Sequence, residues 1–287
     1  MADNVYLNGE ILDREQARIS PSDRGFLHGN GFFETLRIGP KGLFRLGAHL
    51  DRLSEACRCC GWEWVPSADR IGDAVGHLIR DNRVELGYLR ITVSAGPSEG
   101  SLDDLTVREP TVYIDAHAME LPPLDKAPPL ALCRAEHRIN ETSPLVNHKA
   151  TAYHENVLAL ARGRARGADE VYFLNFRDEL TEGAFTNLFF VSNGVVRTPE
   201  EACGLLPGIT REALLEICGQ EDVPVEVGRF KENALRAADE IFCTNSLRGV
   251  VPVEQVMGQA QKLPAPGPLT RRLQENYGRL VGRESHL

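Results

Sequence analysis

The chain has 287 residues, of which 42% are hydrophobic and 25% are charged, and its formal net charge is −9 at pH 7. These values are typical of a globular protein with one large domain or two of ordinary size, and they exclude a chain too poor in apolar residues to form a core. The acidic balance argues against a nucleic-acid partner. The lack of an apolar run of about 18 residues and of a leader pattern argues against a membrane and for a cytoplasmic location.

The first part of the chain is predicted to contain strands, then two helices, then strands. The pair Asn8-Gly9 indicates a hairpin across residues 4–12, because this dipeptide adopts the tight turn that joins antiparallel strands. Further strands are expected at 31–38, 42–46, 88–96 and 111–118, and helices at 46–61 and 68–82, from their apolar spacing.

Cys57 and Cys60 belong to the first of these helices, at helical spacing from Leu50 and Leu53. This spacing places both thiols on the apolar face of the helix. No second ligand pair occurs at a spacing typical of zinc sites, so we expect no metal, and the seven cysteines are interpreted as reduced thiols.

A proline-rich stretch interrupts the pattern in the middle of the chain. Prolines at 122, 123, 128 and 129 cannot donate interior ladder hydrogen bonds. We therefore predict a small domain of residues 1–120, a linker of residues 121–130 and a larger domain of residues 131–287. The larger domain is expected to have strands at 130–139, 170–175, 187–199 and 240–245, followed by the segment 246–256, and helices at 153–165, 208–219, 231–238 and 268–282. This irregular mixture favours the α+β class over a doubly wound sheet.

Two single residues stand at the ends of predicted elements. Lys149 lies between the loop "SPLVNH" and the helix predicted from Tyr153. Glu182 precedes Gly183 and a turn of small residues, where a carboxylate can meet a buried ring nitrogen. Taken alone, each has an ordinary interpretation, as a solvated lysine and as a turn residue.

Three other places suit a phosphate group. Ile209 and Thr210 open a helix, and the N–H groups, the dipole and the hydroxyl there can bind an anion. Asn245 and Ser246 follow a strand and can form a nest of N–H groups. Arg52 is a guanidinium on a mostly apolar helix. An amine, a carboxylate and a phosphate cup are together what pyridoxal 5′-phosphate requires, so we predict this cofactor.

The chain resembles the class IV (fold type IV) pyridoxal-phosphate aminotransferases, a family that includes branched-chain aminotransferase, D-amino-acid transaminase and aminodeoxychorismate lyase. The resemblance runs from Asp23 to Val253 and rests on "DRGFLHGNGFFETLR", "HLDRL", "HKATAYHENVLA", "LTEGAFTNLFFV", "LLPGITR" and "TNSLRGVVPV". It implies a small N-terminal α/β domain, a larger C-terminal domain, the cofactor in the cleft between them, and a homodimer.

The resemblance also implies a role for each matching residue. Lys149 in "HKA" would hold the cofactor as a Schiff base and move a proton, and Glu182 in "TEG" would bond the ring nitrogen. The phosphate would be bound by Arg52, Ile209, Thr210, Asn245 and Ser246. Tyr153, four residues after Lys149, is expected on the same helical side, where it would support the lysine or the cofactor hydroxyl.

Three functions remain open at this point. The first is amino transfer between a branched-chain or D-amino acid and a 2-oxo acid. The second is aminodeoxychorismate lyase activity, which yields 4-aminobenzoate and pyruvate. The third is a non-catalytic binding protein on the same scaffold, which the joint presence of Lys149 and Glu182 disfavours.

The residues for substrate contact separate these functions only in part. Thr35 in "FETLR" matches a threonine that the lyase uses. Lyases and D-amino-acid transaminases usually carry an arginine after the "ITVS" strand, where this chain has Ala95 and Glu99 instead. The substrate candidates, with the arginines as carboxylate partners, are Phe33, Thr35, Arg90, Arg138 and Arg248.

Overall fold

A computed structural model describes residues 3–62, 64, 67–98, 100, 107, 109–260 and 262–286. The chain divides into two compact units, the first made of residues 1–121, 148–152 and 284–287 and the second of residues 122–147 and 153–283. Both units contain helices and strands, and the predicted α+β class is confirmed. Glu99, which the sequence analysis singled out, lies outside the described residues.

The units differ from the predicted domain boundaries because strand pairing joins segments that are distant in sequence. Residues 122–130 group with the second unit. Residues 148–152 group with the first unit because Ala150 pairs with Phe32. Residues 284–287 also group with the first unit, and there Ser285 pairs with Phe44. Neither pairing leaves a local pattern in the sequence.

The first unit is built on one antiparallel sheet of seven strands, in the order β15-β4-β3-β5-β6-β1-β2. Its strands are β1 (Asn4–Leu7), β2 (Glu10–Asp13), β3 (Gly31–Gly39), β4 (Gly42–Phe44), β5 (Gly87–Ser94), β6 (Thr111–Ala118) and β15 (Ser285–His286). Its helices are α1 (Arg24–His28), α2 (Leu46–Cys59) and α3 (Ala68–Asp81), with a 3-10 turn, η1 (Arg14–Gln16).

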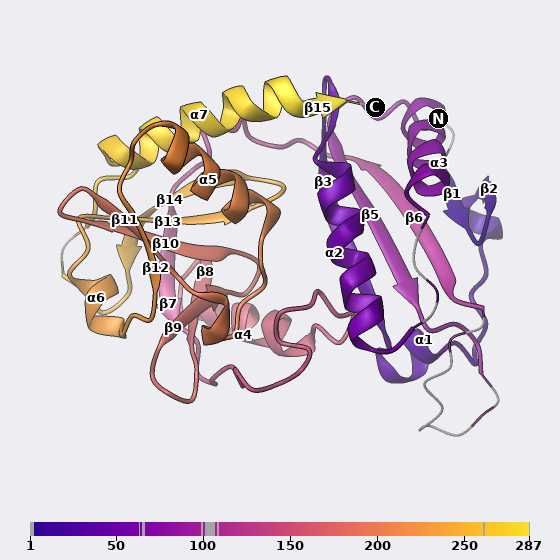
Figure 1. Cartoon of the computed structure of the whole chain (residues 1–287), viewed down its shortest axis with the longest axis horizontal. Coiled ribbons are helices and arrows are strands. Elements are labelled where there is room, and N and C mark those ends of the chain that lie inside the picture. Colours follow the sequence, from indigo (N-terminus) through magenta and orange to yellow (C-terminus); the bar gives the residue numbers. More distant parts are fainter. Residues whose placement is uncertain are drawn as a thin grey trace. The chain divides into compact units, whose positions relative to one another are not determined.

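The helices α2 and α3 cover one face of this sheet (Figure 1). Side chains alternate along a strand, so Phe32, Leu36 and Ile38 of β3 face the helices and join one buried cluster with them. Cys57 is fully buried in that cluster, as predicted, whereas Cys60 is only partly buried because α2 ends one residue before it. The intervening residues of β3, which include Phe33 and Thr35, belong to the opposite face.

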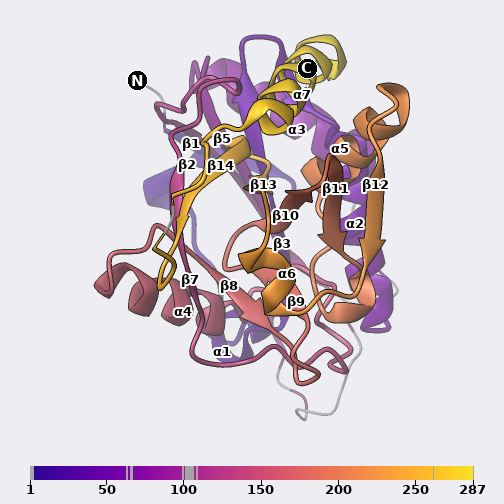
Figure 2. The ribbon, with the colours of Figure 1, turned by 90° about the vertical axis from the view of Figure 1, so that its left-hand side faces the viewer.

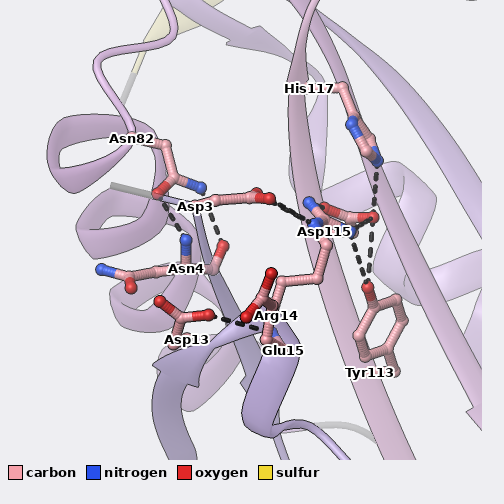
Figure 3. A network of polar contacts seen from close by, with 9 residues as sticks. All are labelled: Asp3, Asn4, Asp13, Arg14, Glu15, Asn82, Tyr113, Asp115 and His117. Carbon is pink, nitrogen blue, oxygen red and sulfur yellow. Dashed lines mark hydrogen bonds and ion pairs between the residues drawn. The ribbon is translucent and has the colours of Figure 1, made fainter. Parts of the chain in front are cut away.

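A polar network fastens the N-terminal hairpin to β6 (Figure 3). The Arg14 guanidinium donates to both oxygens of Asp115 at 2.9 and 2.6 Å and to both oxygens of Asp3 at 2.9 Å. His117 Nε2 lies 2.5 Å from the same Asp115 carboxylate. Burial opposes the charge on Asp115, but Arg14 and His117 keep its pKa below the usual range.

The second unit contains a mixed sheet of eight strands, in the order β12-β11-β10-β13-β14-β7-β8-β9, and β9 also pairs with β10. Its strands are β7 (Leu130–Arg134), β8 (Glu170–Leu174), β9 (Leu180–Gly183), β10 (Asn187–Ser192), β11 (Val195–Pro199), β12 (Val225–Gly228), β13 (Glu240–Asn245) and β14 (Gly249–Val256). Its helices are α4 (His154–Ala165), α5 (Ile209–Gln220), α6 (Glu232–Arg236) and α7 (Pro268–Glu284), with a 3-10 turn, η2 (Glu201–Cys203).

The pairing of β9 with β10 closes six of these strands into a ring. The closing contact is the pair Glu182 and Asn187. Helix α4 packs along β7 and β8 (Figure 2), and Ala159 and Leu160 of the helix belong to one buried cluster with Val171 of β8. The ring therefore carries one of the predicted cofactor residues at its point of closure.

The longer predicted elements are present in the structure, including the hairpin at Asn8-Gly9. Sequence reasoning missed α1, β9, β12 and β15, which are all five residues or shorter. Among the described residues, no helix combines the length and the apolar composition that a membrane crossing would require.

Candidate active site

Lys149 lies in the first unit, in an extended segment that runs beside β3. The N–H of Phe33 donates to the Lys149 carbonyl at 2.9 Å, and the N–H of Thr151 donates to the Gly31 carbonyl at 2.8 Å. Helix α4 begins only at His154. Lys149 thus precedes the helix, as predicted, and backbone pairing with β3 fixes its main chain.

The side chain of Lys149 contacts an aromatic ring on the sheet face opposite helices α2 and α3. Its Nζ lies 4.6 Å from the centre of the Phe33 ring, and Arg90 Cζ lies 4.0 Å from the same centre. Cations are attracted to the face of an aromatic ring at such distances. Arg90 is the β5 residue directly opposite Thr35 of β3. Four sequence-predicted residues, Lys149, Phe33, Thr35 and Arg90, thus share one part of the first unit.

Arg52 lies on the covered face of the same sheet, in contact with a buried carboxylate. Its Nε and Nη2 atoms donate to the two oxygens of Glu34 at 2.8 and 2.7 Å, a bidentate geometry. His49 Nδ1 lies 2.7 Å from Glu34 Oε2. Because a carboxylate only accepts hydrogen bonds, Nδ1 must carry the hydrogen. Sequence reasoning missed Glu34 and His49, since neither stands out beside its apolar neighbours.

The charges of this trio are fixed by burial and pairing. Burial alone would raise the pKa of Glu34, but Arg52 and the hydrogen bond from His49 hold that pKa at about 2. Burial lowers the pKa of His49, although Glu34 opposes the change. At neutral pH the trio therefore consists of one anion, one cation and one neutral imidazole.

We expect Glu34→Gln to destabilise the protein by about 3 kcal/mol at pH 7, the free energy that corresponds to a pKa of about 2 against a model value of 4.5. Because the folded-state pKa is lowered, this stabilisation is present above about pH 4.5 and is lost as the pH falls toward 2. Burial lowers the pKa of His49, so His49 also makes both proteins less stable as the pH falls below about 6.5. Urea unfolding at a series of pH values measures the difference.

Glu55→Gln is a suitable control, because Glu55 belongs to the same helix as Arg52 but its side chain is 66% exposed. We expect that change to cost less than about 0.5 kcal/mol at every pH. A stability gap for Glu34→Gln that stays constant down to pH 3 would show that Glu34 is not held as an anion.

Glu182 lies in the second unit, half-buried on β9 rather than in a turn. Its Oε2 accepts hydrogen bonds from Asn187 Nδ2 at 3.2 Å and from the Leu206 N–H at 3.0 Å. Two donors on one oxygen stabilise the charged form of a carboxylate and fix its direction. Glu182 is thus oriented by a strand pair and by the loop that precedes α5.

Asn187 is a residue of this site that sequence reasoning missed. Besides Glu182, its Nδ2 donates to the Leu206 carbonyl at 2.8 Å. A Cβ atom on Gly208 would lie 2.0 Å from Asn187 Oδ1, so only glycine fits at that position. Asn187 therefore links the carboxylate of Glu182 to the residue that caps α5. In the sequence it is only the first residue of a predicted hairpin.

Helix α5 begins where the sequence predicts it, at Ile209. Gly208 is the N-cap residue and offers no side chain, and Ile209 and Thr210 form the first turn of a helix that continues to Gln220. The first N–H groups of a helix have no acceptor within the helix. The Thr210 hydroxyl, in contrast, lies 3.2 Å from the hydroxyl of Tyr277 on α7.

The predicted nest at Asn245 and Ser246 has a different structure. Asn245 ends β13, and its Oδ1 accepts hydrogen bonds from the N–H groups of Leu247 and Arg248 at 3.2 and 2.8 Å. An asparagine side chain often mimics a backbone turn in this way. Two of the N–H groups in this turn thus already donate to the protein.

Tyr153 precedes α4 as its N-cap residue. The prediction that it shares a helical side with Lys149 is wrong, because Lys149 lies outside the helix. Its hydroxyl donates to the Ala184 carbonyl at 2.8 Å, and its ring packs on that of Phe185. Tyr153 therefore holds the turn that follows Glu182.

The two other candidate arginines belong to the second unit. Arg138 donates to the Asn175 carbonyl at 2.7 Å and pairs with Asp178 at 2.5 Å. Arg248 donates to the Pro128 carbonyl at 3.2 Å. Of the three candidates, only Arg90 lies in the same unit as Lys149 and contacts the same ring.

Comparison with known proteins gives consistent results along the whole chain. The description "Amino-transferase class IV" belongs to the family model that matches residues 31–256. An aminodeoxychorismate lyase of Bacillus subtilis is 29% identical over 98% of this chain and 96% of its own. The branched-chain aminotransferase of Thermoproteus uzoniensis, solved with norvaline, is 29% identical with a TM-score of 0.88, over 98% of this chain and 96% of that one. A branched-chain amino acid aminotransferase of T.th., solved with pyridoxamine 5′-phosphate, is 25% identical with a TM-score of 0.88, over 99% and 95%.

Proposed function

Because the chain belongs to the class IV aminotransferases, which depend on pyridoxal phosphate, we propose that it transfers amino groups between a branched-chain or D-amino acid and a 2-oxo acid through Lys149. The observation that carries this proposal is the placement of the Lys149 amine and the Arg90 guanidinium over one aromatic ring. A reactive amine beside a group that binds carboxylates is the arrangement that an amino acid substrate requires.

The residues of the second unit fit the rest of the cofactor. Glu182 presents a carboxylate whose Oε2 accepts hydrogen bonds from two donors. Helix α5 begins with N–H groups that have no acceptor within the helix, behind a glycine that no other residue can replace without a clash. These groups would hold a ring nitrogen and a phosphate, respectively. When bound, the cofactor supplies a carbonyl carbon for attachment of an amine and a ring that withdraws electron density.

The residues of this chain then have distinct tasks. Lys149 Nζ carries a proton to and from the substrate, and its backbone bonds to β3 keep it in place. Arg90 binds the substrate carboxylate, and Phe33 lies between the substrate and the sheet. Glu182 keeps a proton on the ring nitrogen. Arg52, held by Glu34, contributes positive charge for the phosphate.

Lyase activity is the second candidate, supported by Thr35, which lies opposite Arg90, and by the similarity to the lyase of Bacillus subtilis. An assay in two parts separates the candidates. One part measures conversion of the cofactor to its aminated form with a panel of L- and D-amino acids, and the other measures pyruvate and 4-aminobenzoate formed from aminodeoxychorismate. Activity in neither part would refute both functions.

We also propose a homodimer, as the family resemblance implies. Two large apolar side chains of α1, Phe26 and Leu27, are 75% and 51% exposed in the single chain, and contiguous exposed apolar groups commonly mark interfaces. Light scattering at assay concentration tests this proposal. An active monomer would contradict it.

We expect Arg52→Lys to weaken cofactor binding more than it slows the reaction. Lysine keeps a positive charge beside Glu34. Alanine would leave that buried carboxylate without its cationic partner, so a loss of folding could be mistaken for a loss of cofactor binding. Loss of the guanidinium fork should raise the Kd of the cofactor about tenfold or more. Titration of activity with cofactor measures the change.

The matched control is Arg58→Lys, on the same helix but 58% exposed, which should leave the titration unchanged. Excess cofactor should restore most of the activity of Arg52→Lys. If activity remains low at saturating cofactor, the role of Arg52 is not phosphate binding.

A further inference from the structure

Glu170 is a buried carboxylate that the reaction described above does not use. It begins β8 and is 5% exposed. Its oxygens accept hydrogen bonds from the N–H groups of Val171, Ala184 and Phe185 at 2.9, 3.0 and 3.4 Å, and from the Thr186 hydroxyl at 3.4 Å. Three of these four donors belong to the turn between β9 and β10, directly after Glu182.

Burial of a charged carboxylate in this position costs free energy of folding. Burial raises the pKa of Glu170, and the hydrogen bonds offset only part of this rise. Among the described residues, Glu170 forms no ion pair with an arginine or lysine, so only neutral donors offset the loss of solvation. A glutamine would bring one acceptor oxygen and an NH2 group that faces other donors. The site is therefore built for two acceptor oxygens.

Side chains from α4 and its N-cap bind a different backbone group of the same turn. The Ala184 carbonyl accepts hydrogen bonds from Tyr153 at 2.8 Å and from Asn156 Nδ2 at 3.0 Å. A Cβ atom on Gly183 would lie 2.3 Å from Thr186 Oγ1 and 2.9 Å from the Val171 carbonyl, so the turn is pressed against β8. Both polar groups of the Ala184 residue are thus bound by side chains from other elements.

The turn also joins two residues of the candidate site. Glu182 precedes it and Asn187 follows it, and these two are paired across β9 and β10. Asn187 in turn contacts the loop before α5. A shift of this turn would move the Glu182 carboxylate and its hydrogen-bond partner together.

We propose that Glu170 is a positioning residue, which fixes the direction of the Glu182 carboxylate by anchoring the backbone of the turn from Gly183 to Thr186. This inference rests on the proposed function, because it assigns Glu170 a task toward the cofactor ring nitrogen. Glu170 itself does not touch the reacting atoms. A misplacement of about 1 Å in a reacting group can cost on the order of a hundredfold in rate.

The test compares Glu170→Gln with a matched control, Glu240→Gln. Glu240 is a buried carboxylate of the same unit, and it accepts hydrogen bonds from the N–H groups of Leu269 and Thr270 at 3.0 and 2.8 Å, at the start of α7. Both changes remove one acceptor oxygen from backbone donors. Only the first acts on the turn after Glu182.

The first measurement is hydrogen exchange of the cofactor-free protein, read on peptides that cover residues 183–187 and 268–272. We expect Glu170→Gln to speed exchange in the first peptide by roughly tenfold or more, and Glu240→Gln to speed it only in the second. This measurement does not depend on the proposed function. Unchanged exchange at residues 183–187 would overturn the inference.

The second measurement is the half-reaction with the best amino donor at saturating cofactor. Glu170→Gln should lower the rate roughly tenfold or more. It should leave the KM of the donor unchanged, because the ring nitrogen is remote from the donor. Glu240→Gln should retain the wild-type rate. Faster exchange with an unchanged rate would overturn the inference, while wild-type protein without any half-reaction would refute the proposed function instead.

If Glu170→Gln does not fold, Thr186→Val replaces it, because that change removes only the hydroxyl that donates to Glu170. A severalfold effect in the same direction on both measurements is then expected. No effect of Thr186→Val on either measurement would overturn the inference.

Discussion

Replacement of Lys149 by alanine is expected to abolish amino transfer while the chain still folds. The lysine side chain is half-buried and its Nζ lies over the ring of Phe33, so its loss removes one cation–π contact of about 1 kcal/mol. Its backbone bonds to β3 do not depend on the side chain. Loss of the proton carrier alone should slow the reaction by roughly 10²–10⁴-fold, and loss of the nucleophile adds to this.

The measurement is the half-reaction with the best amino donor, followed by peptide mapping after borohydride treatment. Wild-type protein should carry the label on Lys149, and the variant should carry none. The control is Lys126→Ala, because Lys126 is exposed. This variant should show the labelling and the rate of the wild-type protein. Small primary amines in the buffer should restore part of the activity of Lys149→Ala. A label on another lysine, or an undiminished rate, would end the assignment.

The fold follows from the sequence wherever the signal is local. Spacings of a few residues predict the turn at Asn8-Gly9 and the apolar faces of α2 and α3. The structure contains each of these features. The two-residue strand β15 has no pattern of its own, because its partner β4 lies about 240 residues earlier in the chain. Lys149 illustrates the same limit, since its neighbours in space are β3 residues.

The candidate site shows this limit more sharply. The joint occurrence of single residues at element ends, together with the family resemblance, selected Lys149, Glu182 and the start of α5 as candidates. The residues that orient them were not recognisable, because Glu34 lies within an apolar strand and Asn187 opens another. Their function depends on partners that only the folded chain brings near, namely Arg52 for Glu34 and Leu206 for Asn187. Sequence patterns thus identify candidate reactive groups more readily than the residues that orient those groups.

Replacement of Glu182 by glutamine should slow the half-reaction by about a hundredfold or more, while the cofactor still binds. Glu182 Oε2 receives hydrogen bonds from Asn187 and from the Leu206 N–H. The oxygen of a glutamine must face these two donors, so its NH2 group would face the ring nitrogen of the cofactor. That donor favours the unprotonated nitrogen and thus reverses the preference of the carboxylate. Loss of such an electrostatic partner in a preorganised site costs about 3 kcal/mol or more.

The measurement is a single-turnover half-reaction with the best amino donor at saturating cofactor. The control is Glu232→Gln, because Glu232 belongs to the same unit and its side chain is 19% exposed, and its partners are Arg134, Arg236 and Tyr172. That variant loses ion pairs and should lose stability, yet it should retain the wild-type rate. The Kd of the cofactor should change little for Glu182→Gln, because Lys149 and the start of α5 remain. A variant with normal rate would mean that Glu182 only closes the ring of strands at Asn187, and the ring nitrogen would then need another partner.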